Sequence, residues 1–300
     1  MAKSDQTAPR PKTRIKWDIL IGMIVIHAGA LLAFWTFNWK AFWLFVALQV
    51  VTSLGITLCY HRLLTHRSFQ VPKWLEYVLT VCGLLALQGG PLKWVSTHRV
   101  HHAFSDRPND PHSPNKGFWW AHMLWLFAWD DLTDVPEKYL KFVTDLNRDP
   151  VHRFLERTNA LWSFALGGIL FAWGGLPFLA WGFFARLVCV YHGTWLVNSA
   201  SHLWGYQSYD TNEGSRNNWW VALISYGEGW HNNHHAYPHS AAHGLRWWEV
   251  DPTYFLIRLF GFFGLATNIR MPQGNPARLP NPIGQSIIPK IAIPIPRLST

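Results

Sequence analysis

The sequence predicts an all-α integral membrane protein with four transmembrane helices arranged as two hairpins. Of its 300 residues, 49% are hydrophobic and only 14% are charged, whereas soluble proteins carry about 25% charged residues. The chain also has 20 tryptophans, and tryptophan favours the membrane–water interface, where its ring meets both environments. Four apolar runs, finally, have roughly the length of about 20 residues that a membrane-crossing helix needs.

The four predicted spans form two pairs. Residues 18–37 and 41–60 are each long enough to cross a bilayer, and the NWK sequence between them is short enough for a hairpin. A second pair is predicted at 160–176 and 177–200, joined at the sequence GGLP. An even number of spans places both chain ends on the same side of the membrane.

Positive charge near the span ends predicts the orientation. Five basic side chains precede the first span, whereas the first hairpin loop offers Lys40 alone and the second offers none. The termini and the long segment after the first hairpin are therefore expected in the cytoplasm. The predicted division is a basic tail, a transmembrane hairpin, a cytoplasmic segment, a second hairpin, a second cytoplasmic segment and a Pro-rich disordered tail: 1–16, 17–60, 61–158, 159–200, 201–270 and 271–300.

Three other features carry less information. Residues 74–90 form an apolar run that is too short for a fifth span, so a buried or interfacial helix is expected there. The net charge of +9 is interpreted as membrane-surface charge or a preference for an acidic partner, because no basic helix or RNA-binding signature accompanies it. Arg186 lies inside the fourth predicted span, where a charge suggests function, and both structural pairing and substrate contact are open.

Histidines gather in three motifs, HRLLTH at 61–66, HRVHH at 98–102 and HNNHH at 231–235. The last two have the spacing i, i+3, i+4, so on a helix each can direct three imidazoles at one point. The spacing of five in the first motif does not share a face on a continuous helix, so His66 is expected beyond a helix end. All three motifs are predicted on the cytoplasmic face.

This clustering predicts a metal centre, because imidazole is the commonest metal ligand among side chains. Structural zinc takes four ligands and catalytic zinc about three. Nine candidate histidines are therefore too many for one metal ion and suit two. The ligand type leaves iron, copper, zinc and nickel open. The nine candidates include one histidine at the end of the fourth span: His61, His66, His98, His101, His102, His202, His231, His234 and His235.

The other histidines are interpreted as packing residues, because none repeats the spacing: His27, His112, His122, His152, His192, His239 and His243. Glu228 precedes His231 with the E-x-x-H spacing of soluble di-iron proteins, but no second copy is present. With Asp106 and Asp110 it is expected to accept the other ring N–H of a ligating histidine. A metal transporter is disfavoured, because its ligands should lie near the bilayer midplane.

At these motifs the chain resembles the membrane fatty-acid desaturase family, over roughly residues 17–270. The shared stretches are HRLLTHRSF, WVSTHRVHH, DPHSPNKGFWWAH, NSASHLWGY and GEGWHNNHHAYPHSA, and the resemblance is strongest to the bacterial and cyanobacterial acyl-lipid delta-9 branch. It implies a four-helix stem with a cytoplasmic cap. It also implies two iron ions held by the nine histidines, with Asn198 taking part through water, and a plasma or thylakoid membrane location if the chain is cyanobacterial.

The resemblance further implies insertion of a cis double bond between carbons 9 and 10 of an acyl chain, using O₂ and two electrons. It implies a bent acyl tunnel with four residues near the bend: Gln88, Trp94, Thr194 and Trp195. Gln49, Ser53 and Thr57 precede His61 by helical turns in the span where the family controls chain length. They are predicted to line the tunnel end, the alternative being interhelical hydrogen bonding.

The electrons must come from another protein. No GxGxxG, CxxC or CxxCH motif is present, so no bound flavin, haem or nicotinamide is expected. The resemblance implies reduced ferredoxin, a small acidic protein, as the donor. An acyl-CoA desaturase and a lipid hydroxylase or ketolase are alternatives. The NSASH, PKWLEY and RWWEVD stretches favour desaturation over hydroxylation.

Overall fold

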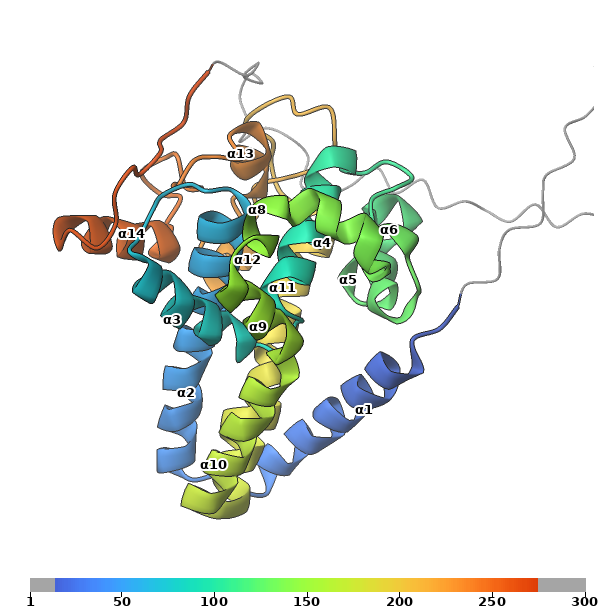
Figure 1. Cartoon of the computed structure of the whole chain (residues 1–300), viewed down its shortest axis with the longest axis vertical. Coiled ribbons are helices and arrows are strands. Elements are labelled where there is room, and N and C mark those ends of the chain that lie inside the picture. The colour runs from blue at the N-terminus through green and yellow to red at the C-terminus, as the bar shows by residue number, and fades with distance from the viewer. Residues whose placement is uncertain (1–13, 275–300) are drawn as a thin grey trace, which may run out of the picture.

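The computed structural model describes residues 14–274, and all regular elements within that range are helical, apart from isolated β-bridges. The all-α prediction is therefore confirmed for the described chain. Most of the predicted basic tail (1–16) and of the Pro-rich tail (271–300) lies outside the described residues. Long helices descend from a group of shorter ones, and α1 leans away from α2 and α10 (Figure 1).

Three helical stretches of the described chain are long and apolar enough to cross a membrane: Trp17–Phe34, Trp39–Thr65 and Asn159–Leu203. The first contains α1 (Trp17–Leu31) and a short 3₁₀ turn. The second contains α2 (Trp39–Leu54), which continues without a break as the π-helix η2 (Gly55–Thr65). Asn38 caps α2, since its side-chain oxygen accepts the backbone N–H of Ala41 at 2.9 Å. The connection therefore ends at Asn38, within the predicted NWK break.

The third stretch stands where two spans were predicted, so the structure gives three candidate spans instead of four. It contains α10 (Asn159–Leu179), the π-helical η6 (Ala180–Ala185) and α11 (Arg186–Leu203). Gly175, in the predicted GGLP junction, interrupts it with φ 63° and ψ −153°, a conformation that glycine adopts readily. Residues on either side of this glycine pack together, because a Cβ at Gly182 would lie 2.9 Å from Leu170.

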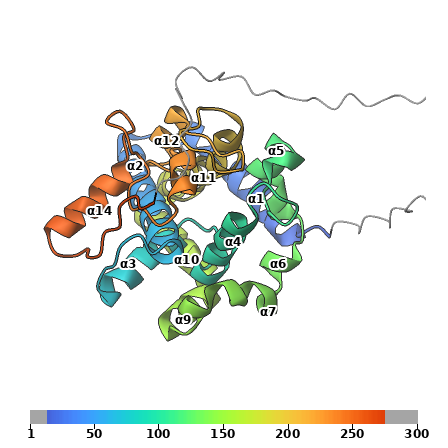
Figure 2. The same cartoon turned by 90° about the horizontal axis from the view of Figure 1, so that it is seen from above.

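The remaining helices surround the upper ends of the spans (Figure 2). The two that carry histidine motifs are α4 (Pro91–Phe104), whose first residue is proline, and the short α13 (His231–Ala236). The others are α3 (Lys73–Leu84), η3 (Pro114–Lys116), α5 (Phe118–His122), η4 (Leu124–Phe127), α6 (Asp131–Asp134), α7 (Pro136–Tyr139), η5 (Leu140–Val143), α8 (Thr144–Asn147), α9 (Pro150–Arg157), α12 (Trp219–Ile224) and α14 (Pro252–Phe262). The first part of the apolar run at 74–90 thus forms a short helix, α3, as predicted, and the helix ends at Leu84.

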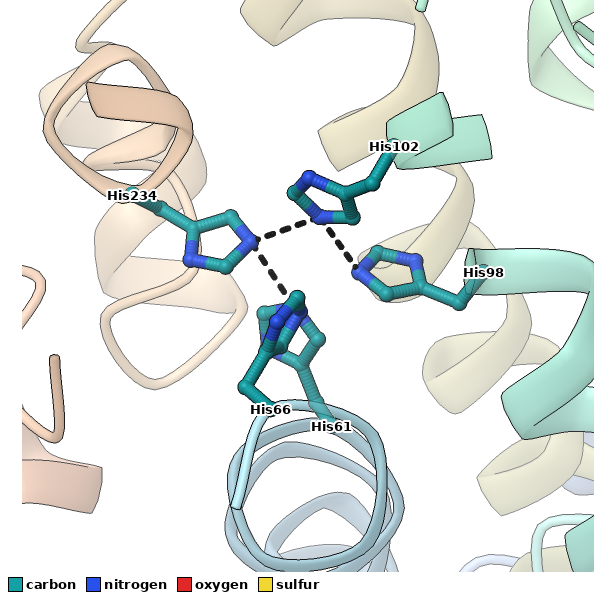
Figure 3. Close-up of side chains that lie close together, drawn as sticks. All are labelled: His61, His66, His98, His102 and His234. Carbon is teal, nitrogen blue, oxygen red and sulfur yellow. Dashed lines mark hydrogen bonds between the residues drawn. The ribbon is translucent and has the colours of Figure 1, made fainter. Parts of the chain in front are cut away.

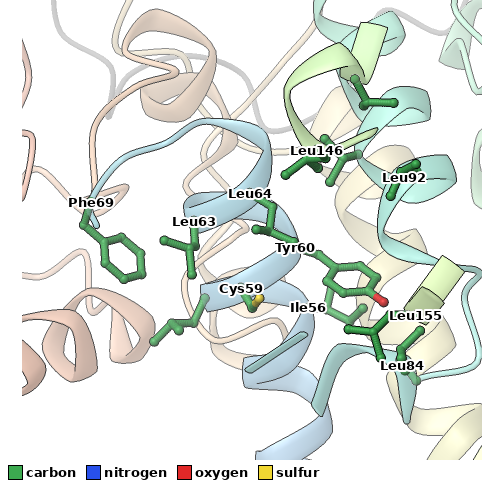
Figure 4. Packing of buried hydrophobic residues seen from close by; sticks show 14 of the residues in the cluster. Ile56, Cys59, Tyr60, Leu63, Leu64, Phe69, Leu84, Leu92, Leu146 and Leu155 are labelled. Carbon is green, nitrogen blue, oxygen red and sulfur yellow. The ribbon is translucent and has the colours of Figure 1, made fainter. Parts of the chain in front are cut away.

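A hydrophobic core fastens η2 to the helices around it. Tyr60, Leu58 and Leu92 are almost completely buried within it, and Figure 4 shows Tyr60 among leucines from neighbouring elements. An added Cβ at Gly83 of α3 would lie 2.4 Å from the Tyr60 ring, so α3 can approach η2 only because this residue is glycine. This packing holds the His61 segment against α3 and α4.

Candidate metal centre

The nine predicted histidines converge in two groups. In each group every histidine has one ring nitrogen that lies within 4.8 Å of the corresponding nitrogens of the others. The first group, shown in Figure 3, contains five residues: His61, His66, His98, His102 and His234. The second contains four: His101, His202, His231 and His235. The structure therefore brings together every histidine that the sequence singled out.

The triplets on α4 and α13 are each divided between the two groups, which corrects the expectation that each would point at one centre. On α4, His98 and His102 join the first group and His101 the second. On α13 the division is reversed, since only His234 joins the first group. At 100° per residue, an i, i+4 pair is 40° apart, whereas the i+3 residue lies about 60° to the other side. Each helix therefore links the two groups.

The π-helical geometry of η2 explains the spacing of five in HRLLTH. The backbone N–H of His66 donates to the carbonyl of His61 at 3.1 Å, the i→i+5 bond of a π-helix. The two rings consequently share a face, with centroids 4.8 Å apart. The prediction that His66 lies beyond the helix end is confirmed, because η2 ends at Thr65.

The distances between ring nitrogens fit metal ions. Neighbouring Nε2 atoms are 3.2 Å apart for His61–His234, 3.0 Å for His234–His102 and 3.1 Å for His102–His98. In the second group, His202–His231 and His231–His235 are 3.0 and 3.1 Å apart. Two nitrogens bound at about 2.1 Å to one ion, at right angles, would be about 3.0 Å apart.

Carboxylates lie behind several of these rings, at the nitrogen that faces away from the group. Oxygens of Glu228, Asp110 and Asp106 lie 2.6, 3.1 and 3.2 Å from Nδ1 of His61, His101 and His202. A proton held on Nδ1 leaves Nε2 with only a lone pair. These three rings can therefore each offer a lone pair to a metal ion, so the donor set fits metal.

All three carboxylates thus occupy the outer positions predicted for them, and the contacting oxygens of Glu228 and Asp110 belong to buried residues. Sequence reasoning missed a fourth, Glu213, whose oxygens lie 3.8 Å from Nδ1 of His202 and 3.7 Å from Nδ1 of His235. No spacing relative to the histidine motifs could have identified it, since it lies on the loop between α11 and α12.

Arg62 is a second residue that the sequence did not single out. It is completely buried, and its Nε and Nη2 donate to one oxygen of Glu228 at 3.1 and 3.0 Å. Its Nη1 donates to Asp251 at 2.9 Å. Burial would raise the pKa of Glu228, but the Arg62 and His243 charges lower it well below its ordinary value, so this carboxylate is ionised.

Burial and neighbouring imidazoles lower the pKa of six of the nine histidines well below 6.5: His66, His98, His102, His231, His234 and His235. A neutral imidazole is the form that binds metal. The centre is therefore electrostatically suited to metal ions at neutral pH.

The remaining histidines lie outside both groups, as expected, but several contact them. His243 lies 3.0 Å from the Glu228 oxygen that faces His61, and His112 lies 3.7 Å from Asp110. Nδ1 of His239 lies 2.9 Å from the His66 carbonyl. His27, His192 and His122 form a hydrogen-bonded row, with ring nitrogens 3.2 and 2.9 Å apart. His152 lies beside Glu76 and Asp149.

Two cavities meet at the centre. The first, of about 560 Å³, is lined by His61, His98 and His231 and therefore reaches both groups. The second, of about 1370 Å³, shares four lining residues with the first: Trp94, His98, Thr194 and Asn198. Asn198 precedes His202 by one turn on α11, so the two share a helix face.

Of the four residues predicted near a bend, Trp94 and Thr194 lie at this junction, whereas Gln88 and Trp195 line the second cavity alone. Gln88 donates to the hydroxyl of Thr194 at 3.0 Å and accepts from Nε1 of Trp94 at 3.2 Å. The Trp94 ring stacks on His98 with centroids 5.3 Å apart. Trp195 lines the second cavity and stacks on Tyr191.

Gln49, Ser53 and Thr57 all line the first cavity, beyond the histidines. An interhelical hydrogen bond of the alternative interpretation is present too, since the Thr57 hydroxyl lies 2.9 Å from the hydroxyl of Thr253 in α14. Gln49 donates to Ser53 at 3.2 Å within α2 itself. Thr57 thus both lines the cavity and joins two helices.

Arg186 is buried and contacts protein groups. It donates to the carbonyls of Gly182 and Leu85, each at 2.7 Å, and to the hydroxyl of Thr52 at 2.9 Å. It lines neither of the two cavities. These contacts favour structural pairing over substrate contact and fix the loop that carries Gln88.

Comparison with known proteins gives a consistent result. The family model for fatty acid desaturases matches residues 37–260. The chain is 50% identical to the sn-1 stearoyl-lipid 9-desaturase of Synechocystis sp. over 267 residues, which cover 88% of this chain and 83% of that protein. It is 50% identical over 268 residues to the protein of the same description from Anabaena variabilis, with 88% and 97% covered. The palmitoyl-monogalactosyldiacylglycerol delta-7 desaturase of Arabidopsis thaliana is 49% identical over 255 residues, with 84% and 68% covered.

Proposed function

The chain belongs to the fatty acid desaturase family, and from this premise we propose that it introduces a cis double bond between carbons 9 and 10 of a saturated acyl chain esterified to a glycerolipid. Two of the relatives described above are stearoyl-lipid 9-desaturases, whereas the third acts at delta-7 with nearly the same identity. The bond position must therefore depend on local cavity geometry. The observation that carries the proposal is one cavity lined by both histidine groups, by Gln49 and Ser53 of α2 and by Thr57 of η2.

The reaction requires redox chemistry, because an unactivated methylene has neither an acidic proton nor a leaving group. We propose two iron ions as the bound metals, one for each histidine group, and when bound they supply the O₂-dependent removal of two hydrogen atoms. His61, His66, His98, His102 and His234 would hold one ion. His101, His202, His231 and His235 would hold the other, with Asn198 acting through water.

The chain's own residues then position one C–H pair beside the centre. We place the acyl chain through the second cavity and into the first, past Trp94 and His98. Gln88 fixes the bend by holding Trp94 and Thr194 together. Gln49 and Ser53 would end the tunnel and so set the number of carbons beyond the bend.

The polar end of the second cavity suits a lipid headgroup. Lys16 and Lys93 both pair with Asp134, at 3.0 and 2.7 Å, and all three line the cavity. Lys16 immediately precedes the first candidate span, so this end lies where a membrane interface would be. A glycerolipid could thus keep its headgroup in the interface while its acyl chain extends to the histidines.

We further propose four membrane crossings with the histidine centre in a cytoplasmic cap. The turn at Gly175 and the packing of Gly182 against Leu170 support two crossings within Asn159–Leu203. The helix α14 lies across the direction of α2 (Figure 1) and exposes Phe255 and Phe262 by 71% and 83%. Such an apolar helix face is typical of a helix lying in the membrane interface. The proposed electron donor is reduced ferredoxin.

The test is expression of the full chain in a host that lacks a delta-9 desaturase, with gas chromatography–mass spectrometry of membrane lipids and mapped double bonds. We expect a new 9-monoene from the wild type, none from His101→Ala, and wild-type product from His27→Ala, because His27 belongs to neither group. Hydroxylated chains would refute desaturation. A new 7-monoene would refute the position, and product confined to acyl-CoA would refute the lipid substrate.

A further inference from the structure

A surface depression of about 1000 Å³ opens onto the histidine centre and shares no lining residue with either cavity. It is lined by His66 and His102 of the first group and by His235 of the second. The first cavity instead reaches His61, His98 and His231. The two groups thus form a wall between the depression and the cavities, and both groups are accessible from each side.

The rim of the depression is basic. Arg107 is exposed, and Arg99 lines the same wall. Arg99 and the exposed Arg67 both pair with Asp145, so these three side chains together carry one net positive charge. The acidic lining residue, Glu213, is engaged inward, where Ser215 donates its backbone N–H at 2.7 Å and the rings of His202 and His235 lie nearby.

We infer that this depression is the docking site of the electron donor, a small acidic electron-transfer protein, and that electrons reach the centre through the rings of His102 and His235. The inference rests on the proposed function. Substrate fills the cavities on the other side of the wall, so a donor at the depression can approach while an acyl chain is bound. A basic rim attracts an acidic partner over long range and speeds its encounter.

The electron count requires two encounters for each turnover. Two donor molecules are each oxidised by one electron, and the acyl chain gives up two more electrons with its two hydrogen atoms. Together with two protons from water, these reduce one O₂ to two water molecules. Weak, rapidly exchanging redox complexes bury comparatively little surface, which suits a shallow site that must release the donor after each electron.

Carbodiimide cross-linking to a plant-type [2Fe–2S] ferredoxin tests the location without turnover. Arg107→Lys keeps the charge and adds an amine that can couple to a ferredoxin carboxylate. Arg157→Lys is the matched control, since Arg157 is exposed at the end of α9 and does not line the depression. Mass spectrometry should find a cross-linked peptide at position 107 and not at 157. The cross-linked complex should no longer form in roughly 0.5 M salt, where screening weakens the attraction between exposed charges. Equal coupling at both positions, or none at 107, overturns the inference.

Charge reversal gives an independent readout. Arg107→Glu should raise the apparent KM for ferredoxin roughly three- to tenfold at low salt, because an exposed attraction becomes a repulsion. Arg157→Glu should not, and a single turnover driven by dithionite should be equal in both. Product formation with the same KM in the two variants refutes the docking site alone. Absence of a 9-monoene with cross-linking intact refutes the proposed function and leaves the site.

Discussion

One oxygen of Glu228 lies 2.6 Å from Nδ1 of His61, while the other accepts two hydrogen bonds from the buried Arg62. Arg62 follows His61 directly in the chain, yet Glu228 lies 166 residues further on. The carboxylate thus joins a ligand candidate to a buried cation and fixes both the orientation of the imidazole and the position of its proton. Asp251 holds the guanidinium from the other side at 2.9 Å.

Glu228→Gln is expected to weaken metal binding about 10- to 100-fold, the usual effect of losing a partner behind a ligand histidine. It should also lower the free energy of unfolding by about 3 kcal/mol, because Arg62 loses one of its two buried anions. The measurements are iron content per chain by mass spectrometry and thermal unfolding of the metal-free protein.

The matched control for this change is Glu156→Gln. Glu156 is a second carboxylate with a structural role, since it accepts the backbone N–H of Leu92 at the start of α4 at 2.7 Å. It belongs to neither histidine group. Its variant is expected to lose stability and keep its iron, so equal iron loss in both variants would show that Glu228 acts only through the fold.

The metal-free protein is expected to lose stability as the pH falls below 6.5. Burial and the His101 charge lower the pKa of His112 to about 3, and burial with the His192 ring lowers that of His122 to about 4. In the unfolded chain these rings bind protons from about pH 6.5 downward, whereas the folded state stays neutral. The unfolded state therefore takes up more protons between pH 6.5 and 4, which favours unfolding.

Thermal unfolding of the metal-free protein at pH 7.5, 6.0 and 5.0 measures this effect. We expect the midpoint to fall at each step, and His112→Asn to reduce the change between pH 6.0 and 5.0. An unfolding midpoint that stays constant or rises toward pH 5.0 would contradict the neutral, buried state of these rings.

Ser53→Phe should shift the enzyme toward shorter acyl chains. Ser53 lines the first cavity beyond the histidines, so a phenyl ring there removes space for the end of the chain. Each methylene in such a pocket is worth roughly 10- to 200-fold in selectivity, so the ratio of C16 to C18 monoene should rise at least about tenfold. Val51→Phe is the control, because Val51 is exposed on the same helix. If both variants give the wild-type ratio, the tunnel ends elsewhere.

Thr194→Val should make the enzyme less selective for the position of the double bond. The change keeps the side-chain size but removes the oxygen that accepts from Gln88, so the bend loses one of its two fastenings. We expect roughly a tenfold fall in kcat/KM, as for an unmet buried polar group, together with 8- or 10-monoenes beside the 9-isomer. Thr80→Val, a buried threonine of α3 outside both cavities, is the comparison. Equal activity and position in the two variants would exclude a positioning role for Thr194.

Local patterns were enough to predict much of this molecule. The apolar runs predict membrane helices because their composition alone determines transfer into lipid. The i, i+3, i+4 spacings in HRVHH and HNNHH predict helices, and α4 and α13 confirm them, although each triplet serves two groups instead of one. The nine histidines are identified by the same short-range periodicity, and a carboxylate behind some of them follows from imidazole chemistry.

The tertiary structure alone determined the contacts between segments that are distant in the sequence. Which histidine belongs to which group depends on how α4 and α13 face each other, and the spacing in each motif is compatible with either assignment. The π-helix that turns His61 and His66 to one side depends on packing around η2. Arg62 acquires its role from Glu228, 166 residues further along the chain. Glu213 and His243 acquire theirs from side chains outside their own short segments, His235 and Glu228. Sequence periodicity shows only which residues share a face of one helix. The geometry of a centre built from four elements depends on how those elements pack together.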